Sequence, residues 1–186
     1  MGTAGRPLKT KLFLAIMFQP RVNITEIMNK LKSAYGPVEY SYGPIEFSFT
    51  KYYEEEMGND LLKMYMSFAG LIDREALPGI KVFTNILERE HLAGGRRTIN
   101  LDPGYIAQDK LVLATTKDFY QRLYLAQGIY GEVTLHFRKG RFRYFSWTYP
   151  DYNDPSFLKF LIKVRARLVK ELRRESTVDL RSESPK

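Results

Sequence analysis

The chain has 186 residues, enough for one ordinary domain with a buried core, and 44% of them are hydrophobic. It contains no cysteine, which excludes disulfides, thiolate nucleophiles and cysteine-ligated metal centres and suits a reducing cytoplasm. The formal net charge of +8 favours partners of negative charge, such as phosphates or nucleic acid.

The first element in the chain is an apolar run, Leu12–Phe18. A membrane-spanning helix needs about 20 apolar residues, so we expect no membrane partner and interpret this run as a buried strand. Residues 1–9 are expected to form a flexible tail. Asn23 and Glu26 then form a capping-box pattern, which predicts that a helix begins here.

The N-terminal half of the chain predicts a repeated strand–helix–strand unit. Alternating apolar and polar residues indicate strands, and apolar residues at intervals of three and four indicate helices. The order βαββαβ is ferredoxin-like, and we expect one antiparallel-rich sheet with both helices on one face. The expected strands are residues 11–18, 38–49, 62–71 and 97–103, and the expected helices are residues 24–35 and 75–91.

A β-hairpin and an amphipathic helix extend this core toward the C-terminus. Residues 130–137 and 141–147 flank Lys139-Gly140, which is typical of a hairpin turn. Residues 155–175 carry an apolar stripe at helical spacing, which must pack on the body of the protein.

The predicted organisation is therefore an α+β fold in which residues 10–175 form a single domain. Residues 105–126 fit either a short helix or a strand. Residues 176–186 are expected to be a disordered tail.

Polar chemistry is concentrated in residues 96–118. Asn100 and Asp102 lie two apart on a predicted strand and share one face. We interpret Asp102-Pro103-Gly104-Tyr105 as a tight turn, in which Pro103 fixes one dihedral angle and Gly104 permits a positive φ. Such a group suits a phosphate or carboxylate ligand, with Asp102 as general base or metal ligand. The candidate ligand-binding residues are Arg96, Arg97, Asn100, Tyr105, Lys110, Thr115, Thr116 and Lys117.

Glu132 is the candidate for a second carboxylate, because it lies mid-strand and needs either water or a cation. Paired with Asp102, it could divide acid and base roles or bind Mg²⁺, the candidate metal. In the alternative interpretation, Asp102 caps a turn, the cations are solvated and the face of Glu132 is exposed. The sequence contains no GxxxxGK[ST], GxGxxG, HExxH or GxSxG motif, which excludes the standard forms of those sites.

The C-terminal helix offers a different partner surface. Residues 154–186 hold nine basic and five acidic residues, so they contribute +4 of the net charge of +8. One basic stripe suits a phosphate backbone, although an ordinary solvated helix face has the same pattern. The stripe consists of Lys159, Lys163, Arg167, Lys170 and Arg174.

Several strings in the chain resemble a prokaryotic family grouped as domain of unknown function 4416. The strings are KLFLAIMF, FSFTKYYEEEMG, RRTINLDPGYIAQDKLVLATTKD, GIYGEVTLHFRKGRF and WTYPDY. They follow one another over nearly the whole chain, so the resemblance implies a single domain, and it implies no activity.

Two classes of function therefore remain open. In the first, the chain binds or processes a small anionic molecule around Asp102, Tyr105, Lys110 and Glu132. In the second, it is a non-catalytic module that binds nucleic acid or an acidic partner through the basic helix.

Overall fold

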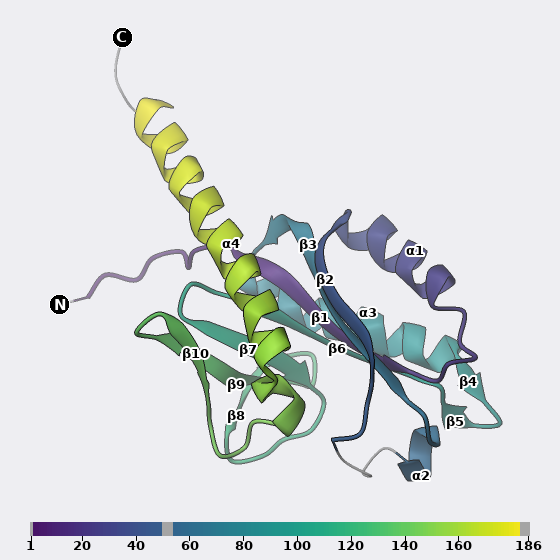
Figure 1. The fold of residues 1–186 in the computed structure, drawn as a ribbon. Coiled ribbons are helices and arrows are strands. Elements are labelled where there is room, and N and C mark those ends of the chain that lie inside the picture. Colours follow the sequence, from purple (N-terminus) through teal and green to yellow (C-terminus); the bar gives the residue numbers. More distant parts are fainter. Residues whose placement is uncertain (1, 50–53, 183–186) are drawn as a thin grey trace.

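The computed structural model describes residues 2–49 and 54–182, which form a mixed α+β fold around one antiparallel sheet (Figure 1). In this part of the chain, eight strands join the sheet in the order β10-β9-β7-β6-β1-β3-β2, and β8 pairs with β9. The strands of the sheet are β1 (Thr10–Phe18), β2 (Val38–Glu46), β3 (Leu62–Ile72), β6 (Ile99–Ile106), β7 (Lys110–Thr115), β8 (Arg122–Ala126), β9 (Ile129–Arg138) and β10 (Arg141–Tyr144). The remaining elements are α1 (Ile24–Tyr35), α2 (Glu54–Met57), η1 (Arg74–Ala76), α3 (Leu77–Glu90), the short ribbon β4 (Leu92–Ala93) and β5 (Arg96–Arg97), η2 (Pro150–Asn153) and α4 (Pro155–Ser182).

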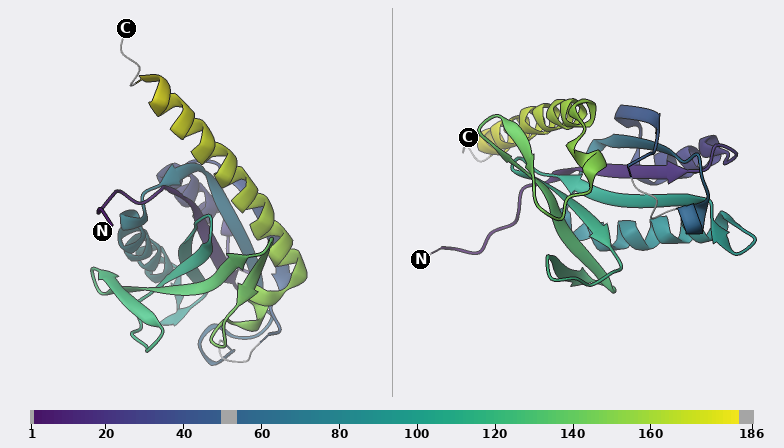
Figure 2. Two further views of the ribbon diagram at one scale, coloured as in Figure 1. Left: turned by 90° about the vertical axis from the view of Figure 1, so that its left-hand side faces the viewer. Right: turned by 60° about the horizontal axis from the view of Figure 1, so that its bottom comes forward.

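The four strands expected for the core lie in this one sheet, as predicted. Their order is β6-β1-β3-β2, and each neighbouring pair is antiparallel. Helices α1 and α3 pack on one face of the sheet, and α4 packs on the other (Figure 2). The residues that fitted either a helix or a strand form β7 and β8.

Strand β1 lies at the centre of the core, and all nine of its residues are buried. Leu12, Leu14 and Ile16 face the layer of α1 and α3. Phe13 and Ala15 face α4. A strand covered on both faces carries apolar side chains on both sides, which is why the run Leu12–Phe18 shows no alternation.

Helix α4 is held on the sheet by its predicted apolar stripe. Phe157, Leu161 and Leu168 are fully buried, and the Phe157 ring lies 4.4 Å from the Tyr65 ring, centroid to centroid. The Asp154 carboxylate accepts hydrogen bonds from the backbone N–H groups of Ser156 and Phe157, which satisfies donors that the first turn leaves unpaired.

Helix α4 continues to Ser182 and so includes residues 176–182, which we expected to belong to a disordered tail. No glycine or proline interrupts residues 156–182, and adding a residue to an existing helix gains a hydrogen bond without a new nucleation cost. Residues 183–186 of the expected tail lie outside the described residues. None of the described helices is both long and apolar enough to cross a membrane.

The predicted turn at Asp102-Pro103-Gly104-Tyr105 is wrong, because these residues lie within strand β6. Each of them pairs with β1, from Ala15 opposite Asp102 to Leu12 opposite Tyr105. Gly104 does not take a positive φ; instead, a Cβ atom there would lie 2.3 Å from the carbonyl oxygen of Val112. The glycine therefore allows β7 to approach β6 closely.

The two faces of α4 can be distinguished by substitution. Leu168→Ala should lower the free energy of unfolding by roughly 2–5 kcal/mol, because it leaves a cavity in a packed core. Lys163→Ala should be nearly neutral, because Lys163 is exposed. Urea denaturation of both variants measures the difference, and equal destabilisation would contradict the assignment of the two faces.

Candidate functional site

The candidate site lies where strands β6 and β7 separate. They pair from Gly104 opposite Leu113 to Ile106 opposite Leu111, and the pairing does not continue to Pro103. The backbone groups of Leu101 point away from β1, so those of Pro103, two residues further, point the same way. Proline has no N–H group to donate to β7, which explains why the ladder ends here.

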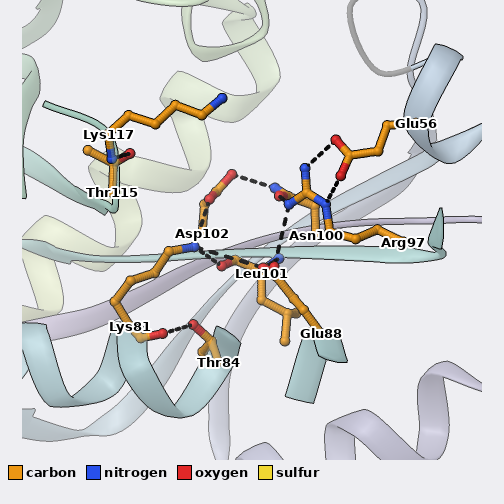
Figure 3. Close-up of polar contacts among 10 residues, drawn as sticks. All are labelled: Glu56, Lys81, Thr84, Glu88, Arg97, Asn100, Leu101, Asp102, Thr115 and Lys117. Atoms are coloured by element: carbon orange, nitrogen blue, oxygen red, sulfur yellow. Dashed lines mark hydrogen bonds and ion pairs between the residues drawn. The ribbon is translucent and has the colours of Figure 1, made fainter. Parts of the chain in front are cut away.

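Helix α3 takes the place of the missing strand beside Leu101 (Figure 3). The Glu88 Oε1 atom accepts a hydrogen bond of 2.7 Å from the Leu101 N–H group. The Lys81 Nζ atom donates a bond of 2.7 Å to the Leu101 carbonyl oxygen. Both side chains are buried, so an unpaired backbone edge is satisfied without water.

A cavity of about 310 Å³ occupies the rest of the gap. If the pairing of β6 with β7 continued in the same register, Thr115 would lie opposite Asp102. Figure 3 shows Thr115 and Lys117 across the gap from Asp102. Five cationic and three acidic side chains line the cavity, which leaves two net positive charges. The charged and polar lining residues are Lys81, Asn85, Glu88, Arg89, Arg97, Asn100, Asp102, Thr115, Thr116, Lys117, Arg122, Glu132 and Tyr149.

Asp102 is the carboxylate with the most access to this cavity, since its side chain is 31% exposed. Its Oδ1 atom lies 3.2 Å from Lys81 Nζ, and its Oδ2 atom accepts a hydrogen bond of 2.6 Å from the Asn100 amide. Burial opposes ionisation, but the charges of Lys81 and Lys63 and the Asn100 hydrogen bond outweigh it and lower the pKa of Asp102. Asp102 is therefore an ionised, oriented acceptor.

Glu88 is the second carboxylate beside Lys81, and its pKa is shifted in the direction opposite to that of Asp102. Burial raises the pKa of Glu88, and the nearby charge of Lys81 only partly offsets this. The Glu88 Oε2 atom also accepts a hydrogen bond of 3.4 Å from Arg97. Arg97 in turn binds both carboxylate oxygens of Glu56 and donates a 2.8 Å bond to the Asn100 Oδ1 atom. These contacts connect the cavity floor to α2.

The cavity wall opposite β6 is formed by β8, by β9 and by Tyr149, which directly precedes η2. Glu132 is buried, and its Oε2 atom accepts hydrogen bonds from Arg122 Nε at 2.9 Å and from the Gln121 amide at 3.1 Å. Tyr149 lines the same wall while remaining half-exposed. Burial raises the pKa of Tyr149, and the charges of Glu132 and Asp102 add to this effect, so its hydroxyl is a neutral donor.

The structure brings together seven of the ten residues expected in the anionic site. Both expected carboxylates, Asp102 and Glu132, line the same cavity. The other five are Arg97, Asn100, Thr115, Thr116 and Lys117.

The three remaining residues lie outside the cavity. Arg96 is exposed in the ribbon formed by β4 and β5. Tyr105 lies three residues after Asp102 on the same strand, so its side chain points to the opposite face of the sheet. There it packs with the apolar cluster of Leu77 and Val112. Lys110 begins β7, at the end away from the cavity, and lies 3.2 Å from the Asp109 carboxylate.

Lys81 and Glu88 were missed by the sequence reasoning. They lie seven residues apart on α3, which places them on one face of the helix. That spacing was a usable signal, because Lys81 and Glu88 lie next to apolar residues of the buried helix face, namely Leu77, Ile80 and Leu87. Buried charged residues two turns apart on such a helix require polar partners, here the β6 edge and Asp102.

Mg²⁺ binding stays a prediction. Within residues 2–49 and 54–182, no group of three histidine or carboxylate side chains could hold a metal ion. Lys81, rather than a cation from solution, lies beside Asp102 and Glu88.

Comparison with known proteins agrees with the resemblance seen in the sequence. A family model described as "Domain of unknown function (DUF4416)" matches residues 8–168, and the chain therefore belongs to this family. The searches of curated proteins and of solved structures each found no match.

Asp102→Asn should change how stability depends on pH in acid. Because the folded pKa of Asp102 lies below its ordinary value of 3.8, the ionised group contributes stability above the unfolded pKa that is lost as the pH falls through the folded pKa. Urea denaturation should show wild type more stable than the variant by about 1–3 kcal/mol between about pH 5 and pH 7. This difference should shrink below about pH 4. A difference that grows in acid would contradict the assignment.

Proposed function

We propose that the chain binds, and through Asp102 can process, a small molecule that carries a phosphate or carboxylate group in the cavity between β6 and β7. The observation that carries the proposal is the lining of this cavity. It combines an excess of cationic side chains with an ionised carboxylate that is held in position and partly open.

We place the anionic group of the ligand at the rim of the cavity, beside Lys117 and Arg89. The buried or half-buried cations Lys81, Arg97 and Arg122 already bind carboxylates of the chain. Lys117 and Arg89 are exposed at the rim of the cavity, where a ligand anion can reach them while they keep part of their hydration. The hydroxyl groups of Thr115 and Thr116 add donors of the kind that bind phosphate oxygens.

The remainder of the ligand meets the floor of the cavity. Asp102 can accept a hydrogen bond from a ligand hydroxyl or amine, and in a reaction it can accept the proton. Glu88, whose pKa is raised by burial, is better suited to donate a proton. Two carboxylates whose environments move their pKa values apart are the usual arrangement for separate acid and base roles. This assignment replaces Glu132, which is bound by Arg122 and Gln121, with Glu88 as the second carboxylate.

We also propose that β1, α1, β2, β3, α3 and β6 form a ferredoxin-like unit to which the arm of β7–β10 and α4 were added. Support comes from the antiparallel order β6-β1-β3-β2 and from the placement of α1 and α3 on one face. In this scheme the site lies at the junction of the unit and the arm.

Calorimetric titration with inorganic phosphate tests the proposed function. Lys117→Ala should weaken binding by about tenfold or more, which is the loss expected for one charge-assisted hydrogen bond. Lys110→Ala is the matched control, since it removes the same charge from the other end of β7, and it should change the affinity by less than about twofold. Equal losses in the two variants, or no binding by wild type, would contradict the proposal.

The basic helix supports a second candidate function, nucleic-acid binding. Lys159, Lys163, Lys170 and Arg174 are exposed along α4. Arg167 is instead held by Glu39 at 2.7 Å and Glu171 at 2.6 Å, which removes the middle of the stripe.

A gel-shift series with single- and double-stranded DNA measures this second function. Binding through the stripe should weaken steeply as salt is added, because phosphate contacts release counterions. Lys159→Ala with Lys163→Ala should weaken it further, whereas Arg167→Ala should have a smaller effect. Absence of a shift at low salt would rule this function out.

A further inference from the structure

An apolar edge formed by residues 119–125 is left uncovered by the rest of the described chain. Tyr120 and Leu123 are 78% and 75% exposed, and the other large side chains of the edge are 41–62% exposed. We define the apolar edge by its five members, which are Phe119, Tyr120, Leu123, Tyr124 and Leu125. A run of this size on the surface needs an explanation, because exposed apolar patches mark sites of association.

The apolar edge coincides with a strand that has one open side. Among the described residues, β8 pairs with β9 and with no other strand. It lies at the periphery of the molecule, away from α4 (Figure 2). Edge strands are usually protected by lysine, proline or a covering loop, but the sequence of β8 is RLYLA. Its one charge, on Arg122, is bound by Glu132 of the same chain.

We propose that two copies of the chain associate through β8, antiparallel to each other across a two-fold axis at Tyr124. Tyr124 is the central residue of the strand, so this register aligns the two copies of β8 along their whole length, although the Arg122 N–H group is already bonded, to the Phe119 carbonyl oxygen. Leu123 then lies opposite Leu125 of the second copy, and Tyr124 lies opposite its own counterpart. A two-fold interface uses the same surface on both copies, and an antiparallel strand pair meets this requirement.

Charge favours a second copy at this place over other parts of the surface. The chain carries a net charge of +8, so two copies repel one another over most approaches. The five residues of β8 carry a single charge, and Glu132 neutralises it. Arg122 would lie opposite Ala126 of the second copy, so the register brings no like charges together.

The exposed area is also sufficient. The three exposed rings of the apolar edge together expose about as much as two complete aromatic side chains, or roughly 300–500 Å². The two leucines and the open backbone of β8 bring each copy close to about 600 Å², where specific interfaces begin. An interface at this lower limit predicts a dimer that dissociates on dilution.

Sedimentation across a range of concentrations tests the association. Wild type should be dimeric at about 100 µM and should dissociate on dilution, consistent with an interface near the lower size limit. Leu123→Lys should be monomeric throughout, with an unchanged thermal melt, because this side chain is mostly exposed in the monomer. Ile86→Lys is the control: it changes an exposed apolar residue on α3 and should leave the dimer intact. A monomeric wild type, or a Leu123→Lys variant that stays dimeric, would overturn the proposal.

The absence of cysteine allows a test of the register as well. Directly opposed residues of antiparallel strands lie about 4.5–5.5 Å apart between Cα atoms, within the range that a disulfide spans. Tyr124→Cys should therefore form a disulfide-linked dimer at least about tenfold faster than Ile86→Cys under mild oxidation. A mixture of the separate variants Leu123→Cys and Leu125→Cys should cross-link faster than either variant alone. Equal rates for Tyr124→Cys and Ile86→Cys would overturn the proposed pairing.

Discussion

The backbone edge of β6 at Leu101 is the constraint on which the site depends. A strand inside a sheet normally has both edges paired, but Pro103 cannot donate toward β7 and the ladder ends at Gly104. The N–H and C=O groups of Leu101 still require partners, and Glu88 and Lys81 supply them. Two charged side chains are therefore buried beside the sheet for a structural reason, and the space that β7 leaves becomes the cavity.

The chemistry of the cavity follows from this structural requirement. Lys81 is bound to Leu101 and also lies beside Asp102, so the lysine that satisfies the backbone keeps this carboxylate ionised. Glu88, which accepts the Leu101 N–H group, is more deeply buried, and its pKa is raised. The pKa values of two carboxylates near one lysine are thus shifted in opposite directions.

The sequence predicted the layers of the fold better than the details of the site. The uninterrupted apolar run of β1 and the stripe of α4 predicted burial correctly, because both patterns follow directly from strand and helix periodicity. Asp102-Pro103-Gly104 was misread because its local turn preference is overcome by eight consecutive pairings with β1. Lys110 and Thr115 could not be separated by sequence, since they stand at opposite ends of one strand and only the end at Thr115 reaches the gap.

The departure of β7 from β6 also connects the cavity with the apolar edge. Thr116 and Lys117 line the cavity, and Phe119 and Tyr120 follow within the same loop. Arg122 belongs to both regions: its guanidinium binds Glu132 in the cavity wall and donates to the Lys117 carbonyl oxygen, while its backbone lies in β8. Arg122 therefore links β8 to the cavity wall at Glu132 and to the backbone of Lys117 at the cavity rim.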